Sequence, residues 1–153
     1  SPKQNRDVPP LHHDWVYRLK QQFPDQQIVI NGGIDSLEAV EGHLRHVDGV
    51  MLGRAAYQTP WLLAECQAKL FGELPFSRRE DVIEPMSLYL ERLAKEGTAV
   101  KYASRHMLGL FQGMPGAKAW RRYLSENAFR DAGNTELLYQ ARDAMRWTGM
   151  VQV

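Results

Sequence analysis

The sequence has one cysteine, no long apolar run and almost no net charge. The lone Cys66 excludes a disulfide framework and a cysteine-based metal cluster within the chain. No apolar run approaches the roughly 18 residues of a membrane span, and the polar opening of the sequence is unlike a signal peptide. The formal charge of +1 gives no overall attraction for nucleic acid. We therefore expect a cytoplasmic protein with no membrane partner.

Two short apolar runs that end in glycine are the most informative feature present. They cover residues 27–31 and 48–52 and are typical of buried parallel strands. Glycine after a strand lets the backbone approach a ligand, and an arginine beside it adds a donor for phosphate. The alternative is that these glycines only relieve strain at two tight turns. The predicted anion-binding residues are Asn31, Gly32, Gly33, Gly53 and Arg54.

Helices are predicted on either side of the first strand. Apolar residues at helical spacing indicate a helix over 14–22 and another over 36–45. Asp35 and Glu38 have the spacing of a capping box, with Asp35 as the N-cap. Strands that alternate with helices predict the last βα units of a (β/α)8 TIM barrel, because 153 residues are too few for the complete barrel of about 250.

The second half of the sequence changes character from α/β to all-α. Short helices are predicted at 54–58 and 60–71, and no strand is predicted after residue 79. Four apolar helical faces follow, separated by glycine-containing turns, and predict a compact antiparallel bundle. The second face comprises Tyr102, His106, Leu110 and Phe111, with His106 expected in the core. The predicted domains are 1–72, the end of the barrel, and 73–153, the helical bundle.

Basic residues gather on the third predicted helix of the bundle, at Lys118, Arg121 and Arg122. A solvated helix face explains them, and so does a contact with nucleic acid. The five histidines lack the spacing of metal ligands, so no metal site is predicted. Cys66 is expected to be a buried, inert thiol.

The sequence resembles the tRNA-dihydrouridine synthases over almost its whole length, and most closely their A-type bacterial branch. The stretches that carry the resemblance are residues 1–6, Ile30–Ile34, Val47–Tyr57 and Arg105–Phe111. The resemblance implies an enzyme in which NADPH reduces FMN and the flavin reduces the C5–C6 bond of a D-loop uridine in tRNA. The residues predicted above for an anion would then hold the FMN phosphate. Contacts with tRNA are implied for Lys3, Arg6, Lys118, Arg121 and Arg122, and the full-length protein is expected to be a monomer.

The chain departs from the family pattern in what it does not contain. About six βα units of the barrel are missing, and with them the motif of the catalytic cysteine; Cys66 does not occupy that motif. We therefore assign no catalytic residue and expect the chain alone to be inactive. One alternative is a tRNA- or RNA-binding module derived from such an enzyme. Another, an unrelated flavin or sugar-phosphate barrel enzyme, leaves the basic helices unexplained.

Overall fold

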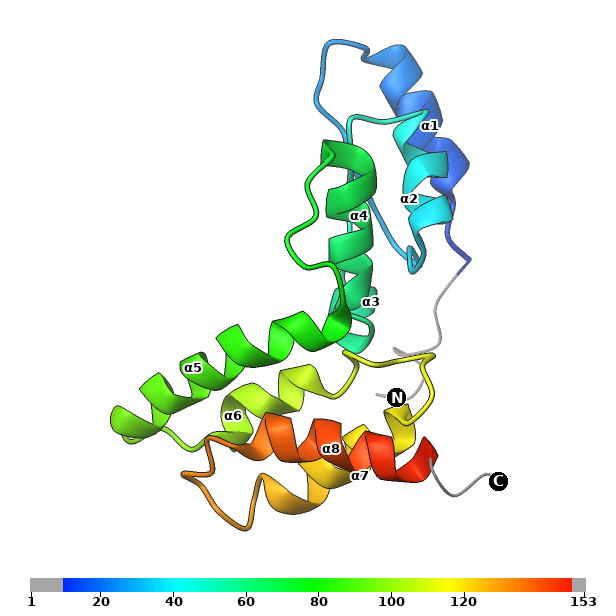
Figure 1. Ribbon diagram of the computed structural model, residues 1–153. Coiled ribbons are helices and arrows are strands. Elements are labelled where there is room, and N and C mark those ends of the chain that lie inside the picture. Colours follow the sequence, from blue (N-terminus) through cyan, green and yellow to red (C-terminus); the bar gives the residue numbers. More distant parts are fainter. Residues whose placement is uncertain (1–9, 150–153) are drawn as a thin grey trace. The chain divides into compact units, whose positions relative to one another are not determined.

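The chain forms two compact units, Ser1–Ala56 and Tyr57–Val153, which we call the sheet unit and the helical unit. The computed structural model describes residues 10–149, which are mostly helical (Figure 1). They also contain a two-stranded parallel sheet. Helix α4 (Trp61–Phe71) lies within the helical unit. The functional boundary predicted after residue 72 stays a prediction.

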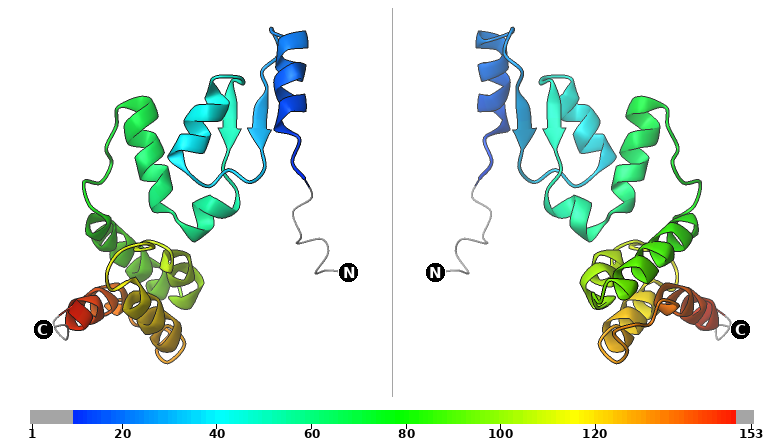
Figure 2. Two further views of the ribbon diagram at one scale, coloured as in Figure 1. Left: turned by 90° about the vertical axis from the view of Figure 1, so that its right-hand side faces the viewer. Right: turned by 90° about the vertical axis from the view of Figure 1, so that its left-hand side faces the viewer.

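The sheet unit alternates helices and strands. Its elements are α1 (His13–Gln22), β1 (Val29–Asn31), α2 (Leu37–Leu44) and β2 (Gly49–Met51). The two strands run side by side in the same direction, with Val29 opposite Gly49 and Asn31 opposite Met51 (Figure 2). Ile30 is buried at the centre of β1 and Val40 on α2. The predicted order of helix, strand, helix and strand is confirmed, although each strand has three residues rather than five.

The predicted N-cap of α2 is wrong by one residue. Ser36, not Asp35, precedes the helix in an extended conformation (φ −141°, ψ 159°), and its hydroxyl accepts a hydrogen bond of 3.2 Å from the backbone N–H of Ala39. Both residue types cap helices well, so composition does not decide between them. The third residue after the cap is Ala39, so Glu38 is not placed for a capping box.

The helical unit is built from helices of very different length. They are α4, α5 (Ile83–Lys95), α6 (Lys101–Ser104), α7 (Ala117–Asn127) and α8 (Leu137–Gly149), with 3₁₀ turns at Arg79–Val82 and Arg105–Met107. A short helix, α3 (Arg54–Gln58), follows β2. As predicted, the described residues after 79 contain no strand.

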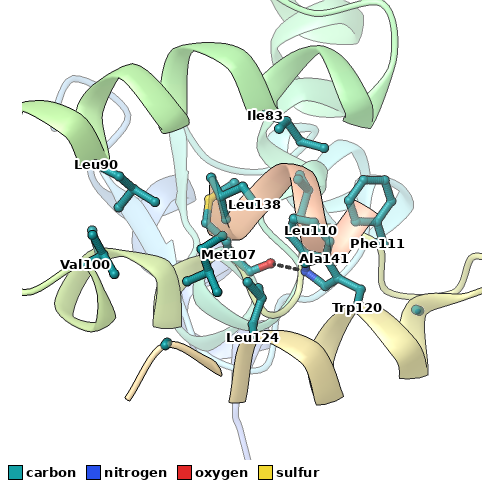
Figure 3. Close-up of a cluster of buried hydrophobic side chains, with 14 residues drawn as sticks. Ile83, Leu90, Val100, Met107, Leu110, Phe111, Trp120, Leu124, Leu138 and Ala141 are labelled. Carbon is teal, nitrogen blue, oxygen red and sulfur yellow. Dashed lines mark hydrogen bonds between the residues drawn. The ribbon is translucent and has the colours of Figure 1, made fainter. Parts of the chain in front are cut away.

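Trp120 lies at the centre of the helical unit's core (Figure 3). Its side chain is fully buried, and its indole N–H donates a 2.8 Å hydrogen bond to the carbonyl of Met107. The ring of Phe111 meets it edge-on, with 4.8 Å between the ring centroids. Leu124 on α7 and Leu138 on α8 are buried in the same cluster, so the apolar faces of these two helices are used as the sequence predicts.

The second predicted helical face is not continuous. Helix α6 ends at Ser104, and a 3₁₀ turn and further turns carry the chain through residue 114. Leu110 and Phe111 are buried as predicted, but His106 is exposed and places its ring edge-on to Tyr57, 5.2 Å away. The prediction of His106 in the core is therefore wrong. Packing of Phe111 against Trp120 overrides the local helical periodicity.

Candidate functional site

The predicted anion-binding residues meet at one edge of the sheet. Asn31 ends β1 and pairs in register with Met51, which ends β2, so the segments that follow both strands leave the sheet at the same edge. Asn31, Gly33, Gly53 and Arg54 are exposed there, and Gly32 is half-buried. The parallel pairing thus brings together two groups of residues, 31–33 and 53–54, that are separated by about twenty positions along the chain.

The loop after β1 requires glycine. Gly32 and Gly33 have φ values of +118° and +65°, which L side chains rarely adopt. A Cβ atom on Gly33 would also lie 2.9 Å from Cδ1 of Leu11, which covers this loop. The Nε2 atom of His13 donates a 2.9 Å hydrogen bond to the carbonyl of Gly32. Leu11 and His13 therefore support the loop, a role that the sequence did not indicate.

The segment after β2 is open. A Cβ atom on Gly53 would have no heavy atom within 4 Å, so the backbone here is accessible to a ligand. Arg54 begins α3, and its exposed guanidinium carries five N–H donors in a geometry that suits phosphate oxygens. Together the two segments offer backbone N–H groups and one arginine at a single edge.

A cluster of histidine and tyrosine side chains contacts the loop after β1 through His13. The hydroxyl of Tyr17 and Nδ1 of His43 are 2.7 Å apart, and the rings of His13 and His43 meet edge-on at 4.6 Å. Burial, followed by the neighbouring His13 and His46, lowers the pKa of His43 below its usual value of 6.5. The lowered pKa favours the neutral form of the His43 imidazole. Among the described residues no group of three or more acidic, histidine or cysteine side chains is placed to hold a metal ion.

The loop that precedes β2 is tied to α1 by Asp48. Its carboxylate pairs with the Lys20 ammonium at 2.8 Å and accepts a hydrogen bond of 2.8 Å from the backbone N–H of Ile28. The hydrogen bond from Lys20, and to a smaller extent that from the Ile28 N–H, lower the pKa of Asp48 below its usual value. The contact fixes the start of β2 beside the start of β1.

The basic residues of α7 lie on two different surfaces. Lys118 and Arg122 line a hollow of about 350 Å³ with Gly116 and Ala119. Arg122 is 4.0 Å from Glu126, but both side chains are more than half exposed, and such a pair is screened by solvent.

Arg121 points elsewhere, because neighbouring positions of a helix are about 100° apart. Its guanidinium donates a 2.6 Å hydrogen bond to Oε1 of Gln112 and lines a hollow of about 370 Å³ with Arg105 and Tyr57. The predicted cluster of three is therefore two smaller basic surfaces. Lys3 and Arg6 lie outside the described residues.

Cys66 is buried on α4, as predicted. In the described part of the chain, no helix is long and apolar enough to cross a membrane.

Comparisons with known proteins agree with one another. The family described as dihydrouridine synthase matches residues 1–146. A tRNA-dihydrouridine(20/20a) synthase of Vibrio cholerae is 50% identical over 142 residues, which are 92% of this chain and 43% of the relative. Proteins of the same name from Shewanella oneidensis and Xanthomonas campestris are each 49% identical, over 95% and 92% of this chain and 44% and 42% of their own lengths. The chain thus spans less than half the length of these relatives.

Proposed function

The chain belongs to the dihydrouridine synthase family, and on that premise we propose that it is the carboxyl-terminal part of an FMN-dependent tRNA-dihydrouridine synthase. The observation that supports this most directly is the shared edge where Gly32, Gly33, Gly53 and Arg54 follow two parallel strands. In this proposal the sheet unit is the end of a (β/α)8 TIM barrel and the helical unit is a tRNA-binding bundle. The substrate is a D-loop uridine at the position that the relatives' name gives, 20 or 20a, and NADPH is the reductant.

A chimera tests the proposal directly. We expect the Vibrio cholerae relative to form dihydrouridine when its matching 142 residues are replaced by this chain, and the chain alone to form none. The chain alone lacks an accessible thiol, since Cys66 is buried. The measurement is the dihydrouridine content of tRNA from cells without their own enzyme, and the relative with the same region deleted is the control. An inactive but folded chimera, or an active isolated chain, would contradict the proposal.

The residues at the sheet edge fit the phosphate of FMN. Two glycines with positive φ shape the loop after β1, and the position of Gly53 leaves space beside the backbone. Backbone N–H groups and Arg54 would bind the phosphate, while His13 engages the Gly32 carbonyl in a hydrogen bond. When bound, FMN supplies the redox chemistry of the reaction. The role of this chain would be to bind and orient the FMN phosphate.

Replacing Arg54 by alanine should weaken FMN binding in the chimera by about 10- to 100-fold, because a hydrogen bond to a charged group contributes about 1.5–3 kcal/mol. Flavin retention is measured by absorbance after dialysis, and affinity for tRNA should hardly change. Arg45→Ala is the matched control, since Arg45 is an exposed arginine at the carboxyl end of α2. If both variants retain flavin equally, Arg54 is not part of the site.

The two basic surfaces of the helical unit are proposed to bind the tRNA backbone. Lys118 and Arg122 share one hollow, and Arg121 lines another with Arg105. Recognition of folded RNA relies largely on shape and phosphate contacts, which arginine and lysine provide without reading sequence. Lys3 and Arg6 are further proposed contacts.

Replacing Arg121 and Arg122 together by alanine should weaken tRNA binding by about tenfold or more. The slope of log K against log salt should fall in magnitude by about 1 to 2, because each lost phosphate contact removes close to one unit. Filter binding at several salt concentrations measures both, with Lys95→Ala, an exposed lysine in the last turn of α5, as control. FMN binding should stay the same; an equal loss of both ligands would refute the division into two sites.

A second candidate function is a non-catalytic RNA-binding module derived from such an enzyme. The observation that favours it is the burial of Cys66, the one cysteine of the sequence. The chimera decides between the two, because a module that no longer supports chemistry would bind tRNA yet leave the chimera inactive.

A further inference from the structure

An apolar hollow of about 360 Å³ lies in the helical unit beside α6 and α7. Leu108, Leu124 and Ala128 line it, and polar groups contribute little of its surface. Its volume is near the lower end of the range of about 300–1,000 Å³ for small-molecule sites. The hollow therefore has room for a small ring system.

Ser104 gives this hollow an unsatisfied polar group. The residue is 1% exposed and lines the hollow, and its hydroxyl has no hydrogen-bond partner among the described residues. A buried hydroxyl without a partner costs free energy, which a ligand that donates or accepts a hydrogen bond would recover. A purely apolar occupant would leave that cost in place.

Aromatic rings and cations stand at the rim. Phe129 and Tyr102 are 73% and 55% exposed, which is unusual for side chains with so much apolar surface. The Lys101 ammonium lies 5.2 Å from the ring centroid of Phe129 and 5.3 Å from that of Tyr102. Arg105 lines the same hollow and adds a second positive charge. The positive charges at the rim favour a ligand with an anionic group, and the exposed aromatic rings favour a ligand with a planar group that can stack on them.

We propose that this hollow binds one unstacked nucleobase of single-stranded RNA. The base stacks on Phe129, its polar edge meets the hydroxyl of Ser104, and the adjoining phosphate meets Lys101 and Arg105. Base-on-aromatic stacking with a neighbouring cation is the usual way in which proteins hold single-stranded nucleic acid. The inference rests on the proposed function for its ligand, but it assigns a surface other than the one formed by Lys118 and Arg122.

A short single-stranded RNA with one 2-aminopurine base tests the site in the 153-residue chain. Stacking quenches the fluorescence of this base, so we expect saturable quenching on addition of the protein. Phe129→Ala should weaken the binding about tenfold and abolish most of the quenching. Phe71→Ala is the matched control, because Phe71 is 69% exposed on α4 and does not line the hollow.

Ser104→Ala separates a ligand contact from a structural role. Removal of an unpartnered buried hydroxyl should leave the thermal midpoint of unfolding unchanged or raise it. Affinity for the RNA should nevertheless fall about fivefold, the effect of one lost hydrogen bond. A lower midpoint with unchanged affinity would give Ser104 a structural role and overturn its place in the site.

Competition identifies the part of the nucleotide that binds. Uridine 5′-monophosphate should displace the RNA, whereas ribose 5-phosphate, which lacks the base, should not. Equal displacement by the two, or quenching that Phe129→Ala leaves unchanged, would overturn the base site. Salt-dependent binding of tRNA without quenching would refute this site alone, and quenching together with an inactive chimera would refute the enzymatic function alone.

Discussion

Replacing Trp120 by alanine should lower the free energy of unfolding of the helical unit by about 3–5 kcal/mol, the usual cost of removing a large buried aromatic side chain. Trp120 is fully buried and touches Phe111 edge-on. Its loss would leave a cavity and also deprive the Met107 carbonyl of its indole partner. A domain of this size is stabilised by only about 5–15 kcal/mol, so the variant would be close to unfolding.

Urea denaturation followed by circular dichroism measures this loss. Trp120→Phe keeps most of the volume but removes the N–H group, so it should fall between the wild type and Trp120→Ala and remain folded. Leu88→Ala, at a side chain that is 59% exposed on α5, should change the free energy of unfolding by less than about 0.5 kcal/mol. A loss below about 1 kcal/mol for Trp120→Ala would show that this ring is not the centre of the core.

The substitution Gly109→Ala, which adds a single methyl group, should destabilise the helical unit almost as much as Trp120→Ala. A Cβ atom there would lie 1.9 Å from the carbonyl oxygen and 2.7 Å from the carbonyl carbon of Gln58. Since backbone atoms cannot rotate away as a side chain can, Gly109→Ala must displace one of the two segments. We expect a loss at the upper end of the range for overpacking, about 3 kcal/mol.

Gly42→Ala is the matched control for this change. Gly42 is in the last turn of α2, and a Cβ atom added to it would meet no heavy atom within 4 Å. Alanine should therefore stabilise the sheet unit by about 0.5–1 kcal/mol through its better helix propensity. Thermal melting of both variants measures the two effects, and opposite signs are the expected result. A Gly109→Ala variant as stable as the wild type would mean that the approach to Gln58 is not required.

The sequence predicts most elements of the fold because hydrophobic periodicity is local. Both strands, α2, α7 and α8 lie where the apolar spacing places them. The prediction of one continuous helical face over 102–111 is wrong, because packing into the core around Trp120 determines this segment more than its helical periodicity does. That core also includes Leu138 and Ala141 on α8, about thirty positions further along the chain, so a local pattern cannot reveal it.

In the candidate site too, the residues with a local sequence signal could be predicted and those that depend on distant contacts could not. Gly32, Gly33, Gly53 and Arg54 are recognisable because glycine after a strand is a local signal with a physical cause. Leu11 and His13 are not, because they reach the loop after β1 from about twenty residues upstream. Arg121 and Arg122 were grouped as neighbours in sequence, whereas consecutive helix positions project in different directions.

The burial of Cys66 has a practical consequence for spectroscopy. Because the only thiol of the sequence is enclosed on α4, it should react slowly with maleimide and iodoacetamide reagents. A cysteine introduced at an exposed position, such as Ser125→Cys beside the apolar hollow, would then take a fluorophore or a spin label selectively, without first removing the native thiol. The native sequence is in this way already prepared for single-site labelling.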